Sequence, residues 1–360
     1  MDLNTIYTGL VVGFLFGFVL QRGRFCMNSA FRDIALLQDF TLLKAVAVAL
    51  LVQLVGFTVM AMGDVIELSP APLLGLANVV GSFVFGVGMV LAGGCASGVT
   101  YRVGEGMVGA MTAVLGLAMG ALMTAVGVLQ PVKDELLAQR PSYTEEADDL
   151  VMASNHNLTV ANVVDIPHEV MAFGIAIVVI AVWVYFARKN KDEDDDYEEP
   201  SYPLFERIFK RGWTWFPTGL AIGVVGMLAF WLSAETGRNY PLGITGGYNN
   251  ILSKLFGVGD YPVISWFGML IIGTILGSLA ATLIAREFKL RAPSAGTVII
   301  TFVGGILMGF GATTSGGCNI GHILSGVPQL SLGSILAGVF IVLGAWAASY
   351  LIFVLPQKMS

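Results

Sequence analysis

Long apolar runs are the feature that most constrains how this chain can fold. About 20 consecutive apolar residues are enough for one α-helix to cross the hydrocarbon core of a bilayer. Only 12% of the 360 residues are charged, and the mean hydropathy of +0.78 excludes an ordinary soluble domain. We therefore predict an all-α polytopic membrane protein with about nine transmembrane helices, at 5–21, 41–63, 75–92, 109–129, 167–187, 214–232, 261–284, 297–313 and 331–355.

Four shorter helical segments lie between these crossings. They are too short to span a bilayer and too apolar to be comfortable as loops, so re-entrant half-helices are the natural interpretation. We expect them near 27–38, 97–107, 247–257 and 319–328.

The distribution of basic residues predicts the orientation. Nine crossings with the N-terminus outside would leave only Lys133, Arg140, Arg238 and Lys254 on the outer face, and 15 of the 19 Lys and Arg residues inside. This bias follows the positive-inside rule, so the C-terminus is expected in the cytoplasm. The start, "MDLNTIYTGL", has no basic segment and does not resemble a cleaved signal peptide.

Two polar segments divide the chain. Residues 130–166 are predicted to form an outer loop, and the acidic stretch at 188–211 a solvated cytoplasmic linker. The expected organisation is a first membrane repeat at 1–130, a connecting region at 131–212 and a second membrane repeat at 213–360.

An internal repeat supports this division. "GSFVFGVGMVLAGGCASG" (81–98) aligns without a gap on "GGILMGFGATTSGGCNIG" (304–321), with six glycines and one cysteine matched. More loosely, "RFCMNSAFRD" aligns on "TGGYNNILSK", which places Gly247 opposite Cys26. Each half has four crossings and two half-helices, and the extra helix at 167–187 would insert the second repeat upside down. Such inverted pseudo-symmetric repeats are typical of secondary transporters.

Three cysteines, Cys26, Cys95 and Cys318, fall at the predicted helix breaks. Their odd number and wide separation predict free thiols, and their spacing matches no zinc site. Gly94 and Gly317 weaken the helix beside two of them. A half-helix that starts after such a break directs unsatisfied N–H groups and a positive dipole end at the gap, which favours an anion.

Other side chains near these breaks complete the candidate site. Asn28, Ser97 and Asn319 can cap the new helices or contact an anion. His322 can reach Cys318 across one helical turn, or can be only a surface or capping histidine. Arg24 belongs to a basic cluster at the predicted cytoplasmic mouth, where topology alone also explains it. A thiol is a weak donor with a polarisable sulfur, and it suits an anion that carries a terminal sulfur or selenium.

The motifs "GRFCMNSAFRD", "AGGCASG" and "SGGCNIGH" resemble those of the YeeE/YedE family of prokaryotic membrane proteins. The resemblance implies uptake of thiosulfate across the inner membrane through an hourglass-shaped fold. It also implies that Cys26, Cys95 and Cys318 relay the anion by S–H···S hydrogen bonds. A small cytoplasmic sulfurtransferase of the TusA type is a frequent companion of such proteins.

Alternative functions remain open at this point. The same thiols could transport a selenium compound or another sulfur compound, or could serve a membrane sulfurtransferase that holds a cysteine persulfide. A soft-metal transporter is a third possibility. The leading hypothesis is a thiosulfate transporter rather than an enzyme, with no cofactor, no metal site and no nucleic-acid partner.

Overall fold

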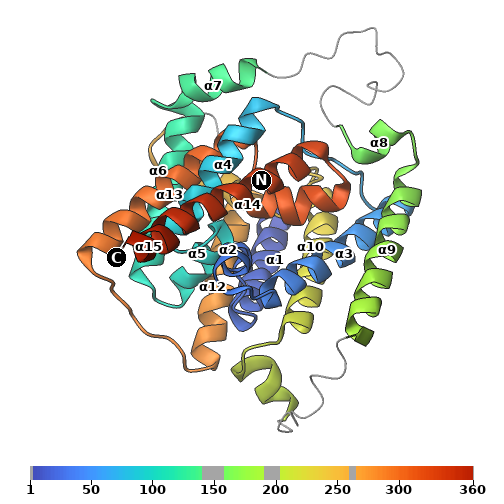
Figure 1. Cartoon of the computed structure of the whole chain (residues 1–360), viewed down its shortest axis with the longest axis horizontal. Coiled ribbons are helices and arrows are strands. Elements are labelled where there is room, and N and C mark those ends of the chain that lie inside the picture. The colour runs from blue at the N-terminus through green and yellow to red at the C-terminus, as the bar shows by residue number, and fades with distance from the viewer. Residues whose placement is uncertain (1–2, 140–157, 190–202, 259–264, 360) are drawn as a thin grey trace.

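The computed structural model describes residues 3–139, 158–189, 203–258 and 265–359. Within them, nine helical stretches are long and apolar enough to cross a membrane, which confirms the predicted polytopic helical fold. Their main helices are α1 (Leu3–Arg22), α3 (Thr41–Met62), α4 (Leu76–Leu91), α6 (Val108–Val126), α9 (His168–Lys189), α10 (Trp215–Ala234), α12 (Trp266–Ile284), α13 (Ala295–Ser315) and α14 (Leu332–Ser349) (Figure 1).

Short helices occupy the four positions predicted for half-helices. They are α2 (Met27–Leu37), α5 (Ala96–Gly104), α11 (Thr245–Leu255) and the π-helix η2 (Ile320–Gly326), which continues into the 3₁₀ turn η3 (Val327–Gln329). Glycines in the left-handed region produce two of the breaks, because Gly93 has φ +72° and Gly316 has φ +85°. These two glycines occupy equivalent positions in the sequence repeat.

Some helices were not expected from the sequence. The predicted outer loop contains α7 (Gln130–Ala138) and α8 (Val160–Val164), and the predicted linker contains the π-helix η1 (Glu206–Lys210). The last crossing continues as η4 (Tyr350–Val354) and α15 (Leu355–Met359). Residues 140–157 and most of the acidic linker lie outside the described residues, so their solvated character stays a prediction.

The most extensive helix contacts join the two parts of the chain that were predicted to be repeats. They are α1 with α12, α3 with α10, α4 with α13, α4 with α14, and α6 with α13. In the order of the two repeats, α1 corresponds to α10, α3 to α12, α4 to α13 and α6 to α14. Exchange of corresponding helices turns the α1–α12 pair into α10–α3 and the α6–α13 pair into α14–α4, as two similar halves would require. The inverted direction of the repeats, and the three-part division of the chain, stay predictions.

Glycines allow these helices to pack closely. A Cβ atom at Gly13 or Gly17 of α1 would collide with the backbone of Leu270 or Thr274 in α12, and one at Gly277 would collide with Phe14. Small residues are used in this way where lipid removes the hydrophobic drive for helices to associate.

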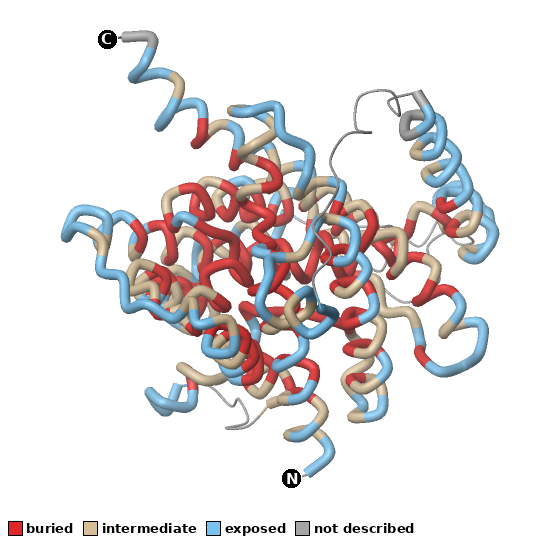
Figure 2. Tube along the Cα trace, turned by 90° about the horizontal axis from the view of Figure 1, so that it is seen from below, coloured by how far each residue is buried: buried red, intermediate tan, exposed pale blue. Residues whose placement is uncertain are grey.

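Buried residues concentrate in the middle of the molecule, whereas α9 lies at its edge (Figures 1 and 2). Only about a tenth of the apolar span in α9 is buried, compared with half of that in α3. The central core consists of one large cluster of buried side chains, and it contains all three cysteines.

Candidate functional site

Two cysteines meet at the starts of two short helices. Cys26 immediately precedes α2 and Cys95 immediately precedes α5, each with extended backbone geometry. The Cys26 thiol donates a hydrogen bond to Cys95 Sγ at 3.8 Å. Both side chains are fully buried, and all three cysteines are free, as predicted.

The start of α5 also contributes polar partners to this thiol pair. Cys95 Sγ caps the helix by accepting from the Gly98 N–H at 3.3 Å, and it lies 3.5 Å from Ser97 Oγ. An N–H group of the first helical turn has no partner inside the helix, so the thiol sulfur satisfies one of these donors. The start of α5 therefore directs an N–H donor at the Cys95 sulfur.

Gly98 is a site residue that the sequence analysis did not identify. A Cβ atom there would lie 2.7 Å from Cys26 Sγ, closer than real Cβ atoms approach, and a tight 3.2 Å from Cys95 Sγ. The absence of a side chain at this position lets both thiols lie against the helix start. The sequence could have indicated this role, because Gly98 follows Cys95 by three residues and so lies in the first turn of the predicted half-helix.

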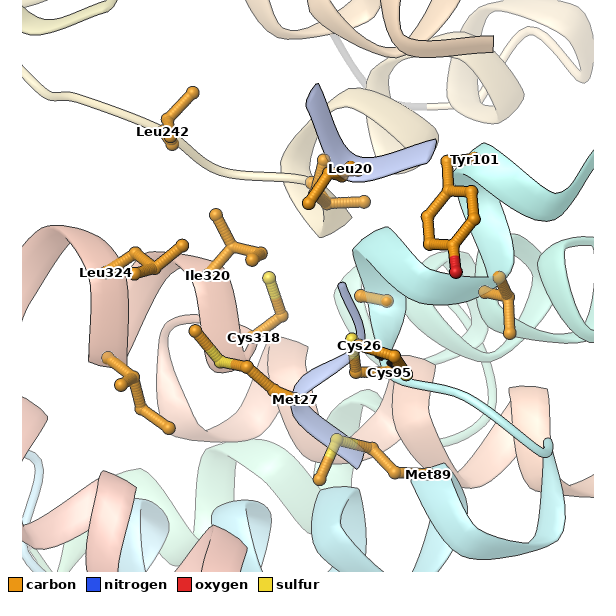
Figure 3. Packing of buried hydrophobic residues seen from close by; sticks show 14 of the residues in the cluster. Leu20, Cys26, Met27, Met89, Cys95, Tyr101, Leu242, Cys318, Ile320 and Leu324 are labelled. Atoms are coloured by element: carbon orange, nitrogen blue, oxygen red, sulfur yellow. Dashed lines mark hydrogen bonds between the residues drawn. The ribbon is translucent and has the colours of Figure 1, made fainter. Parts of the chain in front are cut away.

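Cys318 approaches the same region from the second half of the chain. Figure 3 shows Cys318, Met27, Cys26 and Cys95 in one group of buried side chains. The connection is polar as well as apolar, since Asn319 Nδ2 donates to Met27 Sδ at 3.1 Å. Met27 directly follows Cys26, so this contact joins the Cys318 break to the Cys26 break.

Asn28 and Asn319 are both buried, and both have an unsatisfied oxygen. Neither Oδ1 atom has a hydrogen-bond partner among the described residues. Unsatisfied buried polar atoms are uncommon and mark sites where a ligand or water completes the network. The polar atoms expected near the thiols are thus present and available.

His322 is buried but is not bonded to the Cys318 thiol. Its backbone N–H donates to the Cys318 carbonyl at 2.8 Å, and its ring Nδ1 lies 3.3 Å from Ser334 Oγ. The ring packs against Gly317, where a Cβ atom would lie 3.2 Å from Nε2. Gly317 therefore makes room for the histidine. His322 is therefore not a surface residue, and its ring contacts Ser334 rather than the Cys318 thiol.

Arg102 contacts the break between α4 and α5, and it is a second residue that the predicted site did not include. Its Nη1 donates to the Gly93 carbonyl at 2.6 Å. A Cβ atom at Gly94 would lie 3.1 Å from the same nitrogen, so Gly94 gives the arginine space to reach this carbonyl. The predicted weakening of the helix at Gly94 is thus accompanied by a specific side-chain contact.

The Arg24 side chain contributes to a polar cluster at the C-terminal end of α1. Its side chain is 70% exposed, and its Nη2 lies 3.3 Å from Glu287. The buried Arg22 bonds to the same carboxylate at 2.7 Å. Burial tends to raise the pKa of Glu287, but the hydrogen bond from Gln21 and the charge of Arg22 outweigh it and hold this pKa below its ordinary value.

The fold and the site define a class: a polytopic helical membrane protein whose buried centre holds three free thiols at interrupted helices. Residues 22–347 match the sulphur transport family, and the chain belongs to that family. The resemblance to the YeeE/YedE family, which the cysteine motifs indicated, is thereby confirmed.

Curated relatives span nearly the whole chain. The thiosulfate transporter TsuA of Spirochaeta thermophila is 39% identical over 350 residues, which is 97% of this chain and 99% of the relative. The thiosulfate transporter TsuA of Escherichia coli K12 is 35% identical over 358 residues, covering 99% and 97% of the two chains. A probable transporter of the same bacterium, YedE, is 33% identical over 175 residues, covering 42% and 43%.

Proposed function

We propose that this protein is a transporter that carries thiosulfate into the cell through the buried centre occupied by Cys26, Cys95 and Cys318. The contact between the Cys26 and Cys95 thiols at the starts of α2 and α5 carries the proposal. Family membership and the names of the curated relatives support a sulfur anion as the substrate.

The chemistry of the site suits the terminal sulfur of thiosulfate. The Cys95 sulfur accepts from the Gly98 N–H and lies near Ser97 Oγ, so polar donors already converge on a sulfur atom here. A terminal thiosulfate sulfur that entered this region would accept S–H and N–H donors in the same way. Exchange of one weak S–H···S contact for another lets the ion move without a large desolvation cost.

Cys318 would provide the third contact of the relay. It lies in the same buried cluster, and the Asn319–Met27 bond holds its helix beside Cys26. Because all three thiols are buried, passage of the ion requires the surrounding side chains to move apart. Asn28 and Asn319, with their unpartnered oxygens, would orient water or the ion's hydration shell as this occurs.

The membrane context completes the proposal. The family resemblance favours the inner membrane as the location. The distribution of Lys and Arg favours an N-terminus outside and a C-terminus in the cytoplasm. The polar cluster of Arg22, Arg24 and Glu287 would then lie at the cytoplasmic mouth. A small cytoplasmic sulfurtransferase of the TusA type is a suitable consumer of the imported ion.

The test is uptake of radiolabelled thiosulfate into proteoliposomes. Cys95→Ala removes the donor and should lower the initial rate by about tenfold or more, whereas Cys95→Ser keeps a hydroxyl donor and should retain part of the rate. Normal uptake by the alanine variant would show that transport does not need the Cys95 thiol, and would contradict the relay. Selenium-containing anions, added as competitors, measure how selective the pathway is for sulfur.

One observation favours a rival function. Persulfide enzymes usually use paired cysteines or a base beside the nucleophile, and Cys26 and Cys95 form such a pair. A thiolate would attack the terminal sulfur of thiosulfate, the S–S bond of the ion would break, sulfite would leave, and the cysteine would keep one added sulfur atom. Intact-mass measurement after exposure to thiosulfate distinguishes the two functions, because transport alone leaves the protein mass unchanged.

A further inference from the structure

Two buried N–H donors have no acceptor in the region between α10 and α12. Trp266, the first residue of α12, is 3% exposed, and its indole Nε1 has no hydrogen-bond partner within the described ranges. Arg238 Nη2, in the segment that follows α10, is in the same condition. A buried donor without a hydrogen bond is unfavourable, and a charged donor more so. These two donors on neighbouring side chains therefore indicate a place where an acceptor can bind.

The Arg238 guanidinium is held against Trp266 by its surroundings. Its Nη1 donates to Ser233 Oγ at 3.0 Å and to the Pro241 carbonyl at 3.1 Å. Its Cζ lies 4.5 Å from the centre of the Trp266 ring and 3.4 Å from that of the Phe267 ring. Five donors on a rigid planar group make arginine suited to oxyanions, and here two aromatic rings fix the plane of that group.

The charge of Arg238 is not neutralised within the part of the chain that the structure describes, where none of the ion pairs includes it. Burial lowers the pKa of this guanidinium to about 9, which leaves it protonated at neutral pH. A partly buried cation without a counter-ion is unfavourable, and a bound anion would relieve that cost.

The position of this pair connects it to the thiols. Trp266 packs beside Gly9 of α1, at the opposite end of that helix from Arg22 and Glu287. Tyr240, two residues after Arg238, donates its hydroxyl to the Gly321 carbonyl at 2.9 Å, and the Leu242 N–H donates to Ser325 Oγ at 3.1 Å. The segment that carries Arg238 is therefore bonded directly to η2, the helix that follows Cys318.

We propose that Arg238 and Trp266 form an anion-capture site on the membrane face where α1 begins, with Arg238 binding the oxygens of a small oxyanion and Trp266 donating its indole N–H. The identity of the ion as thiosulfate, and of the face as the outer one, rests on the function proposed above. The site binds oxygens, whereas the thiols bind sulfur. Sulfate should therefore occupy the capture site without being passed to the cysteines.

The experiment measures thiosulfate uptake into proteoliposomes at a series of thiosulfate concentrations, with and without sulfate. Arg238→Gln and Trp266→Phe should each raise KM, the arginine variant by about tenfold or more, with little change in the maximal rate. Competition by sulfate should weaken in parallel. Trp266→Phe keeps the aromatic ring and serves as the milder variant if Arg238→Gln fails to fold.

Matched controls separate a specific site from general surface effects. Trp231→Phe alters an exposed tryptophan on α10, and Lys254→Gln removes a cation that the sequence places on the same face. Both controls should keep the KM of the unmodified protein.

The two proposals fail in different ways. An unchanged KM and unchanged sulfate competition in both Arg238→Gln and Trp266→Phe would overturn the capture site while transport stands. Absence of thiosulfate uptake by the unmodified protein would instead overturn the proposed function. Calorimetric binding of sulfate that depends on Arg238 would then still support the capture site.

Discussion

The Sγ atoms of Cys26 and Cys95, 69 residues apart in the chain, lie 3.8 Å from each other where two short helices begin. Two interrupted segments thus present their thiols to the same point. The contact needs both helix starts, because one thiol comes from the start of α2 and the other from the start of α5. The geometry of the breaks is therefore as much a part of the site as the sulfur atoms.

Gly98→Ala should damage transport without altering any thiol. The new methyl group would lie 2.7 Å from Cys26 Sγ, so one or both thiols must move away from the start of α5. We expect the initial rate of thiosulfate uptake to fall by about tenfold or more. Gly321→Ala is the matched control, because this glycine is the repeat equivalent of Gly98 and a Cβ atom there meets no described atom within 4 Å. Equal activity of the two variants would contradict the packing argument.

Gly13→Ala should destabilise the protein by separating α1 from α12. Its Cβ atom would collide with the Leu270 carbonyl, and overpacking of this kind costs about 1–3 kcal/mol. The measurement is the melting temperature in detergent. Gly174→Ala on α9 has open space among the described atoms and should leave the melting temperature unchanged or slightly higher. An unaltered melting temperature for Gly13→Ala would show that the helices can separate at no cost.

Glu287 should make stability depend on pH in the acidic range. Its pKa is lowered in the folded protein, so its contribution is fully present above the unfolded value of about 4.3 and is lost as pH falls through the folded value. We expect Glu287→Gln to lower the melting temperature at neutral pH and to flatten its decline in acid. Glu206→Gln, which removes an exposed ion pair with Lys210, should change neither. Parallel acid profiles for Glu287→Gln and the unmodified protein would exclude this role.

Arg102→Gln should loosen the break between α4 and α5. The bond from Arg102 to the Gly93 carbonyl would be lost, and the Cys95 segment would no longer be fixed at that end. Lower uptake is expected, with partial rescue in Arg102→Lys, which retains a cationic donor. Arg32→Gln offers a comparison, since Arg32 pairs with its neighbour Asp33 and not with a break. An active Arg102→Gln variant with unaltered stability would count against this account.

The helices could be predicted from sequence because length and hydropathy determine them. The nine crossings and the four short segments all appear within a few residues of their expected bounds. The helix α7 was missed because "QPVKDELLA" is polar and follows a crossing, and its hydropathy does not distinguish it from a loop. The start of α11 at Thr245 also lies three residues before Tyr248, which the alignment pairs with Met27, the start of α2.

The contacts within the site were less accessible to sequence reasoning. The breaks at Gly93 and Gly316 could be inferred from glycine pairs beside cysteines, but no pattern indicates that Cys26 meets Cys95. The position of His322 against Gly317 depends on the path of η2, and the sequence does not predict that η2 is a π-helix. Arg238 and Trp266 are 28 residues apart and share no motif, so only the packed structure brings them together.

The pairing of helices across the molecule has a consequence for how the chain could be divided. α1, α3, α4 and α6 each pack most extensively on a helix from beyond residue 213, so neither portion could satisfy its glycine-lined surfaces by itself. Each portion should therefore need the other in order to fold. Genes for 1–189 and 203–360, expressed separately, should yield fragments that persist only when they are made together.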